Sequence, residues 1–284
     1  MKTLATILTA ALLTVGTTIF AKDDAFPKRI SASNTYVTKQ YNVKDFNAIQ
    51  ISGSGNVYFT QKEGAPSVSV VTADNVAEIL DVYVENKTLY LKFKKGYSVN
   101  NLKKLDFTIS AATINRMGIV GSGDIKLMNG LKTESVELFV SGSGDIKCDN
   151  VTCTGDANVS ITGSGDIEGY GMTCRKLDTH ISGSGDIELD NVNAESVQAI
   201  ITGSGDYKLN GKTEKASYRI SGSGDLNAKE LVADDVTAEV YGSGDITCHA
   251  NKSIKATRSG SGEIGYSGTP SSVDISKKGV HHID

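Results

Sequence analysis

The sequence predicts an all-β protein: a single-stranded parallel β-helix with coils of about 20 residues and a hairpin-rich N-terminal cap. The tetrapeptide Gly-Ser-Gly-Asp occurs seven times and is followed by a Gly-Ser-Gly-Glu variant at Gly260, with successive spacings of 21, 21, 20, 20, 19, 20 and 18 residues. Apolar and polar residues alternate on both sides of it, as they do in a strand with one buried face. The residue two before each motif is β-branched in seven consecutive copies: Ile119, Val140, Ile161, Ile181, Ile201, Ile220 and Val240.

The chain begins with features of a secretory signal peptide. Lys2 supplies a positive start, residues 4–20 are mostly apolar, and small Ala21 precedes the polar Lys22. We expect residues 1–21 to be the signal peptide and residues 22–40 to be a flexible leader. The rest of the chain has no second long apolar run, so we expect no transmembrane segment in the mature protein.

Residues 41–284 are predicted to form one β-solenoid domain. Residues 41–62 carry an isolated first copy of the motif, Gly53-Ser54-Gly55-Asn56. Residues 63–112 contain several short strand patterns and a helical piece near Asp74, which predicts an inserted cap. Regular coils are expected over 113–265 and a C-terminal cap over 266–284, because the open ends of a solenoid need covering.

Two glycines in every motif indicate a tight turn repeated at one edge. Glycine adopts positive φ without steric cost, and it lacks a Cβ that would collide with the turn of the next coil. The predicted turn glycines are Gly121, Gly123, Gly142, Gly144, Gly163, Gly165, Gly183, Gly185, Gly203, Gly205, Gly222, Gly224, Gly242, Gly244, Gly260 and Gly262.

A unit of about 20 residues cannot enclose its own core, so it must stack on neighbours whose equivalent strands pair roughly 4.8 Å away. A β-propeller blade needs about 40 residues, and a leucine-rich repeat needs a leucine motif that this chain lacks. All three prolines lie outside the predicted coils, where every strand must donate hydrogen bonds.

One acidic residue per coil is predicted to line the turn edge: Asp124, Asp145, Asp166, Asp186, Asp206, Asp225, Asp245 and Glu263. Carboxylates about 4.8 Å apart repel one another, so they are either hydrated and hydrogen-bonded to turn amides or neutralised by cations. Calcium, which prefers oxygen ligands, is the natural cation, although one carboxylate per coil offers few ligands. Local hydrogen bonding is the favoured alternative, and no cofactor is expected.

Four cysteines occupy two kinds of position. Cys153 and Cys174 each lie 11 residues after the first glycine of their motif, so they share a column on adjacent coils, within reach of a disulfide. Cys148 and Cys248 fall in an inward column, five coils apart, and are expected to be core thiols.

Charge and histidine content argue against several functions. The formal net charge is −4 with both signs interspersed, which does not suit nucleic-acid binding. The four histidines (His180, His249, His281 and His282) fit neither a catalytic triad nor a zinc motif. Coil lengths vary by three residues at most, which leaves little room for the long loops of a polysaccharide-cleaving β-helix enzyme.

The stretch FNAIQISGSGNVYF, a strand-rich insertion and the SGSGDI repeats together resemble the head GIN domain family of Bacteroidetes, named "putative auto-transporter adhesins". The resemblance covers residues 41–268 and implies a right-handed β-helix, an exported or cell-envelope location and no enzyme activity. It transfers no functional residue.

We therefore expect a non-catalytic, adhesin-like scaffold that presents a flat face to a surface protein or glycan. It would lie in the periplasm, on the outer-membrane surface or outside the cell. The alternatives are a structural polymer formed by self-association of stacked solenoids and, less favoured, a polysaccharide-active enzyme.

Overall fold

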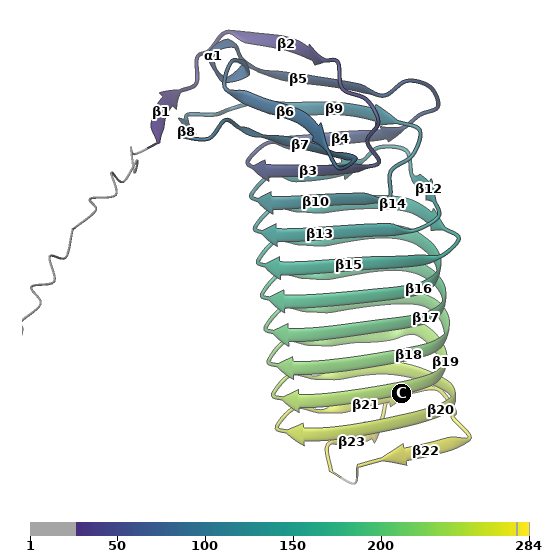
Figure 1. Ribbon diagram of the computed structural model, residues 1–284. Helices are drawn as coiled ribbons and strands as arrows, with labels where there is room; N and C mark the ends of the chain where they lie inside the picture. Colours follow the sequence, from purple (N-terminus) through teal and green to yellow (C-terminus); the bar gives the residue numbers. More distant parts are fainter. Residues whose placement is uncertain (1–26, 277, 284) are drawn as a thin grey trace, which may run out of the picture.

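The computed structural model describes residues 27–276 and 278–283 and shows a parallel β-solenoid with an N-terminal cap (Figure 1). The signal peptide expected over 1–21 lies outside the described residues. The chain winds as a right-handed coil, each turn lying below the previous one in Figure 1. The predicted fold class is confirmed.

The first three coils are built from separate strands because their corners interrupt the pairing. These strands are β3 (Ala48–Gly53), β4 (Asn56–Gln61), β10 (Arg116–Gly121), β11 (Asp124–Leu127), β12 (Leu131–Thr133), β13 (Val136–Gly142), β14 (Ile146–Cys153) and β15 (Asp156–Gly163). From β16 onward, pairing runs through the corner and each coil is one long bent strand: β16 (Ile167–Gly183), β17 (Ile187–Gly203), β18 (Tyr207–Gly222), β19 (Leu226–Gly242) and β20 (Ile246–Gly260).

Two sheets result, and we name them from Figure 1. The front sheet contains β3, β10, β13, β15 and the second halves of β16–β20, which end at the first glycine of each motif. The back sheet contains β4, β11, β14 and the first halves of β16–β20, which begin after the motif. The turns between the two sheets form a straight row that we call the motif edge.

The β-branched column predicted from the sequence is the spine of the core. Ile51, Ile119 and Val140 pair in register, and the column continues through Ile161, Ile181, Ile201, Ile220 and Val240. All eight side chains are at most 1% exposed. Large side chains are matched by small neighbours: Tyr218 lies between Ala199 and Ala238 in its own column. Burial of these columns supplies the main drive for folding.

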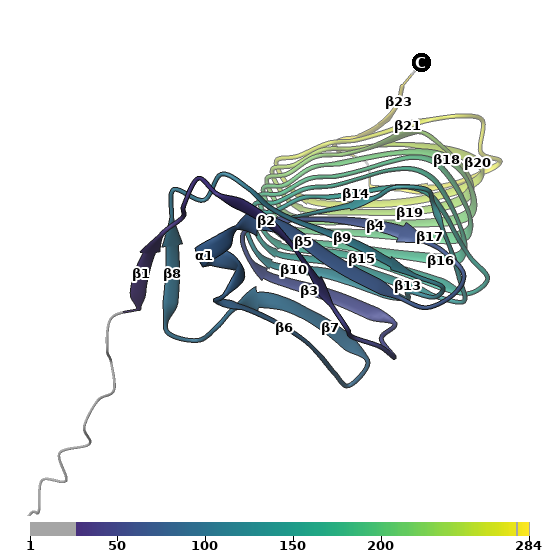
Figure 2. The ribbon, with the colours of Figure 1, turned by 90° about the horizontal axis from the view of Figure 1, so that it is seen from above.

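The cap continues both sheets of the solenoid and then reverses strand direction. Its elements are β1 (Lys28–Ser31), β2 (Tyr36–Tyr41), β5 (Ser67–Ala73), the single helical turn α1 (Asp74–Ala77), β6 (Leu80–Glu85), β7 (Thr88–Phe93), β8 (Tyr97–Asn100) and β9 (Leu105–Ala111). Strands β7 and β9 pair parallel to β3 and β4, while β6, β5 and β2 add antiparallel strands above them (Figure 2).

The flexible leader expected over 22–40 is corrected for its described part. Strand β1 pairs with β8 and strand β2 pairs with β5, so residues 27–40 belong to the cap. Strand β5 has an open edge after pairing with β9, and its backbone groups are satisfied by β2.

The C-terminal segment is a further, shorter coil. Strands β21 (Ile264–Ser267) and β22 (Ser272–Ile275) pair parallel to β20, and β23 (Val280–His282) pairs parallel to β21. Ile264 and Val280 extend the core to this end.

Candidate functional site

The motif edge is held by close backbone contact between successive turns. Gly142 has φ of 138°, and a Cβ there would lie 2.1 Å from the carbonyl oxygen of Gly121. Gly144 has no positive φ, but a Cβ there would lie 1.8 Å from the carbonyl oxygen of Gly123. The first glycine therefore serves both backbone conformation and close approach, whereas the second serves close approach alone.

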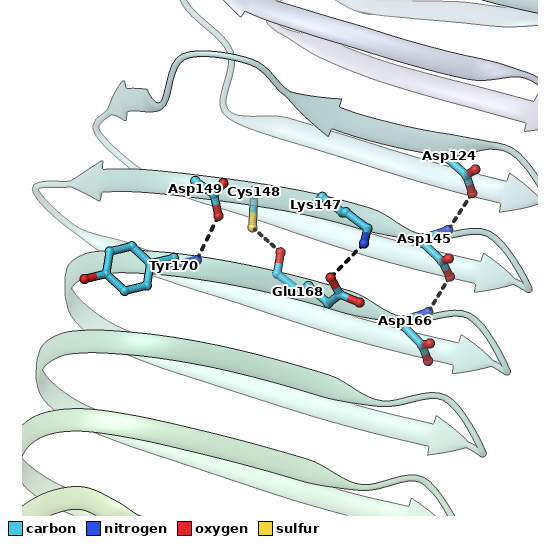
Figure 3. Close-up of polar contacts among 8 residues, drawn as sticks. All are labelled: Asp124, Asp145, Lys147, Cys148, Asp149, Asp166, Glu168 and Tyr170. Atoms are coloured by element: carbon cyan, nitrogen blue, oxygen red, sulfur yellow. Dashed lines mark hydrogen bonds and ion pairs between the residues drawn. The ribbon is translucent and has the colours of Figure 1, made fainter.

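The acidic column forms a hydrogen-bonded ladder along the motif edge. The Oδ1 atom of Asp124 accepts the backbone N–H of Asp145 at 3.0 Å, and Asp145 Oδ1 accepts that of Asp166 at 3.0 Å (Figure 3). The same bond repeats down the column between Asp186, Asp206, Asp225, Asp245 and Glu263, with N···O distances of 2.7–2.9 Å. Each aspartate thus satisfies a turn amide of the next coil.

Calcium binding to this ladder stays a prediction. In the described part of the chain, no three acidic, histidine or cysteine residues are grouped so as to hold a metal ion. One oxygen of each aspartate is already engaged by an amide, which leaves one free oxygen per coil.

Charged residues dominate the back face, and they pair with each other. Lys147 and Glu168 form an ion pair at 2.8 Å on adjacent coils (Figure 3), and Lys208 pairs with Glu188. In each of these pairs, opposite charges on adjacent coils neutralise one another.

The centre of the front face has a different chemistry. We call it the front patch; it comprises Asn158, Ser160, Thr162, Asp178, His180, Ser182, Gln198, Ile200, Thr202, Ser217 and Ser221. These residues point outward because their strand neighbours, such as Ile181 and Ile201, are buried. One residue of the patch, Asp178, carries a formal charge at neutral pH, and it pairs with Lys176 at 2.9 Å. The patch is therefore close to neutral.

Most hydrogen-bonding groups of the front patch have no partner within the described residues. The side chains of Asn158, Gln198 and Thr202 make no protein hydrogen bond, and Oδ1 of Asp178 has no donor. A shallow hollow of about 440 Å³ lies over the patch, and Asn158, His180 and Gln198 are among the residues that line it. This surface is ready to donate to and accept from a polar partner.

An arginine stacked on an aromatic ring borders the patch at each end. The Arg116 guanidinium lies 4.3 Å from the ring centroid of Phe139 and pairs with Glu137 at 3.0 Å. At the other end Arg219 lies 4.7 Å from the ring centroid of Tyr241 and pairs with Glu239. Cation–π contacts and ion pairs fix these rings in place, five coils apart on one face.

A second concavity follows the corner between the sheets. This corner groove of about 540 Å³ is lined by Thr173, Cys174, Asn193, Glu195, Lys212 and Glu214 among others. Glu195 and Glu214 are exposed, whereas a general acid for glycoside cleavage is usually a carboxyl withdrawn from water. The groove does not provide that environment.

The sequence-predicted cysteine columns are present. All four cysteines are buried thiols. Cys148 donates to the Glu168 carbonyl oxygen at 3.6 Å (Figure 3) and Cys248 to the Gly265 carbonyl oxygen at 3.8 Å. Burial raises the pKa of both thiols to about 12. Cys153 and Cys174 lie side by side on adjacent coils.

The histidines are dispersed. His180 lies in the front patch, His249 contacts Ser267 at 3.0 Å, and His282 stacks edge-on with Tyr266. Within the described residues, no helix has the length and apolar character that a membrane span needs.

Sequence reasoning missed a second turn column opposite the motif edge. Asn150, Gly171, Asn191 and Gly211 all have positive φ, and each lies five residues after the aspartate of its motif. Asparagine and glycine are the residues that best tolerate this conformation. Their regular offset from the motif is the signal that would have revealed the corner.

Comparison with known proteins gives a consistent result. A family model described as "putative auto-transporter adhesin, head GIN domain" matches residues 45–188 and 150–270. The crystal structure of "a putative adhesin" from Bacteroides fragilis is 32% identical, with 89% of this chain and 100% of that chain covered and a TM-score of 0.51. A search of proteins with curated descriptions finds no match.

Two further crystal structures share the fold at lower identity. "A putative adhesin" from Parabacteroides merdae is 21% identical, with 90% and 100% of the two chains covered and a TM-score of 0.70. A "putative lipid binding protein" from Parabacteroides distasonis is 24% identical, with 90% and 100% covered and a TM-score of 0.67. The residues matched by the family model include the first coil and nearly all of the later coils. The chain therefore belongs to the head GIN domain family, the putative auto-transporter adhesins.

Proposed function

We propose that this protein is an exported, non-catalytic, adhesin-like binding module that holds a neutral glycan across its front patch. The observation that carries the proposal is the row of unpaired, uncharged hydrogen-bonding side chains on four consecutive coils, exemplified by Asn158, Gln198 and Thr202. Membership of an adhesin family and the N-terminal secretory pattern support the exported, cell-surface part of the proposal.

The geometry of the patch suits an extended, hydroxyl-rich ligand. Coils repeat every 4.8 Å or so along the axis, which places Phe139 and Tyr241 roughly 24 Å apart with the polar rows between them. Sugar hydroxyls both donate and accept, as do the amides and hydroxyls of the patch. The two aromatic rings add flat apolar surfaces at the borders.

The near-neutral charge of the patch selects the class of glycan. An acidic polysaccharide would need several arginine or lysine side chains free to pair with it. Arg116 and Arg219 are instead engaged with Glu137 and Glu239, so we assign neutral rather than acidic chains.

The strand edges at the two ends of the molecule favour a discrete module over a polymer. Charged side chains lie on the terminal strands: Lys39 on β2, Asp81 and Glu85 on β6, and Asp274 on β22. Charges on edge strands discourage pairing with a second chain. A monodisperse monomer in light scattering is the expected result, and filaments would favour the structural polymer.

The test is a glycan array probed with the mature chain, followed by affinity measurement for the neutral glycan that binds. Gln198→Ala and Thr202→Ala should each weaken binding about tenfold, the effect of one or two lost hydrogen bonds. Asn227→Ala, which removes an exposed amide from the back face, is the matched control and should not change affinity.

Salt dependence and product analysis complete the test. Binding of a neutral chain should change little between low and high ionic strength because no net charge is screened, and the glycan should be recovered uncleaved. Binding restricted to acidic glycans, or front variants that bind like the unaltered protein, would refute the proposal.

A further inference from the structure

Cys153 and Cys174 form a thiol pair between adjacent coils. Cys153 is the last residue of β14 and Cys174 lies within β16; their preceding residues, Thr152 and Thr173, pair in register. The two thiols hydrogen-bond to each other, and the residues are 4% and 6% exposed. Strand pairing holds their Cα atoms about 5 Å apart, within the range that a disulfide spans without backbone movement.

The pair lies at the boundary between two kinds of coil. After Cys153 the strand is interrupted at Thr154 and Gly155 before β15 begins, whereas β16 runs continuously through the same corner. The interrupted corner is held by single bonds, such as the Gly155 N–H to the Glu134 carbonyl oxygen at 2.8 Å. A covalent link here would join the last interrupted coil to the first continuous one.

We propose that Cys153 and Cys174 are an oxidation site, at which a disulfide oxidant converts the thiol pair into a covalent clamp between the two coils. Two thiols together give up two protons and two electrons, one S–S bond forms between Cys153 and Cys174, and the S–S bond of the oxidant breaks to give two thiols. This inference does not depend on the glycan proposal.

The surroundings of the pair indicate the order of steps. Cys174 lines the corner groove, so its sulfur is the one that a small disulfide reaches first. Attack of the Cys174 thiolate on the oxidant forms a mixed disulfide and releases the first thiolate. Cys153 then attacks the Cys174 sulfur and releases the second thiolate, and the two protons from the cysteines end on the released thiolates.

The two thiols differ in acidity. The hydrogen bond from Cys174 lowers the pKa of Cys153, although burial opposes it. The same hydrogen bond, followed by burial, raises the pKa of Cys174. The raised pKa keeps Cys174 mostly protonated, so its attack on the oxidant, which needs the thiolate, is the slow step.

The experiment uses the full mature chain, reduced and then incubated with oxidised glutathione. Intact mass should fall by two hydrogen atoms, and a non-reducing peptide map should contain one bridged peptide, Cys153 to Cys174. Cys148 and Cys248, which are buried in the back sheet five coils apart from each other, are the internal controls and should stay thiols.

Thermal melting tests whether the bridge acts as a clamp. Closing a loop of roughly 20 residues should raise the melting temperature by on the order of 5–10 °C, and a reductant should reverse the rise. The double variant Cys153→Ala/Cys174→Ala should show neither change. Any of three results would overturn the proposal. Both thiols could remain under oxidised glutathione, a bridge could form to Cys148 or Cys248, or the melting temperature could stay the same after the bridge forms.

Discussion

The backbone N–H of Asp206 donates to the Oδ1 atom of Asp186 on the preceding coil, with an N···O distance of 2.8 Å. In the opposite direction, the backbone N–H of Ile187 donates to the carbonyl oxygen of Asp206 at 3.0 Å. Asp206 is therefore bound to the preceding coil by both its backbone N–H and its carbonyl oxygen, and the N–H is accepted by the Asp186 side chain. Aspartate recurs at this position of the motif, and its short carboxylate reaches the backbone amide of the next coil.

Replacing Asp186 separates hydrogen bonding from charge. Asp186→Asn keeps the Oδ1 acceptor and should leave stability nearly unchanged. Asp186→Ala removes the acceptor and should lower the free energy of unfolding by about 0.5–1.5 kcal/mol, because the Asp206 amide must find water instead. Urea unfolding followed by circular dichroism measures the difference. An equal loss in both variants would mean that charge, and hence a bound cation, matters more than the acceptor.

Adding calcium is an independent test of what holds the aspartate ladder. If amide hydrogen bonds hold the carboxylates, millimolar calcium should leave the melting temperature where it is, since a weakly bound ion contributes little. Differential scanning calorimetry with calcium and then a chelator measures this. A rise in melting temperature that the chelator reverses would establish the calcium ladder.

Alanine substitutions at three glycines distinguish the need for positive φ from the need for close backbone approach at the turn. Gly53→Ala tests φ alone, because φ is 102° and no atom lies within 4 Å of the added Cβ; we expect a loss of about 1–2 kcal/mol. Gly144→Ala tests the clash alone and Gly142→Ala tests both, so each should cost more than about 3 kcal/mol or prevent folding. Expression yield and chemical unfolding measure the order. Equal losses at all three sites would contradict the close-approach account.

Alkaline pH should destabilise the fold through its core thiols. The pKa of Cys148 and of Cys248 is raised to about 12 in the folded state, against about 8.5 in the unfolded chain. Because the folded pKa is the higher, the contribution is complete below pH 8.5 and is lost as pH rises toward 12. The loss by pH 10 is roughly 2 kcal/mol per thiol.

The pH dependence is best measured in the Cys153→Ala/Cys174→Ala background, in which the two core thiols are the only cysteines left. Adding Cys148→Ala and Cys248→Ala should lower stability at neutral pH but flatten the alkaline slope. An unchanged slope would show that other groups, such as the tyrosines, cause the loss.

Two buried tyrosines should respond oppositely to loss of the hydroxyl. The Tyr218 hydroxyl is buried without a hydrogen-bond partner, whereas Tyr207 donates to the Ile200 carbonyl oxygen at 3.3 Å. Tyr218→Phe should therefore raise the free energy of unfolding by about 1 kcal/mol, and Tyr207→Phe should lower it by a similar amount. Guanidinium unfolding of both variants measures the contrast; a loss in Tyr218→Phe would reveal a hidden partner.

Positions repeated from coil to coil were predictable from the sequence, because the same type of residue recurs at a constant offset from each motif. The Ile119 column and the register of Cys153 with Cys174 follow from counting residues from each motif. The aspartate column was predictable, but its bond to the next coil was not, because the spacing does not show whether a carboxylate bonds to an amide of its own turn or of the next turn.

Features that occur once were the ones missed. Strands β1 and β2 show little apolar alternation, and they are strands because the cap offers open edges to pair with. The front patch was also hidden, since its neutrality depends on outward columns drawn from several coils. An outward serine such as Ser160 looks unremarkable until its neighbours above and below are known.

Because the register between coils is constant, the front face can change in length by whole coils. Removing or duplicating one unit of about 20 residues, for example the stretch between Gly183 and Gly203, would return every column to its place. The front face would shorten or lengthen by one step of about 4.8 Å with the same chemistry per row. Gain or loss of one repeat in the gene would therefore change the length of this face by one coil without changing the chemistry of the remaining rows.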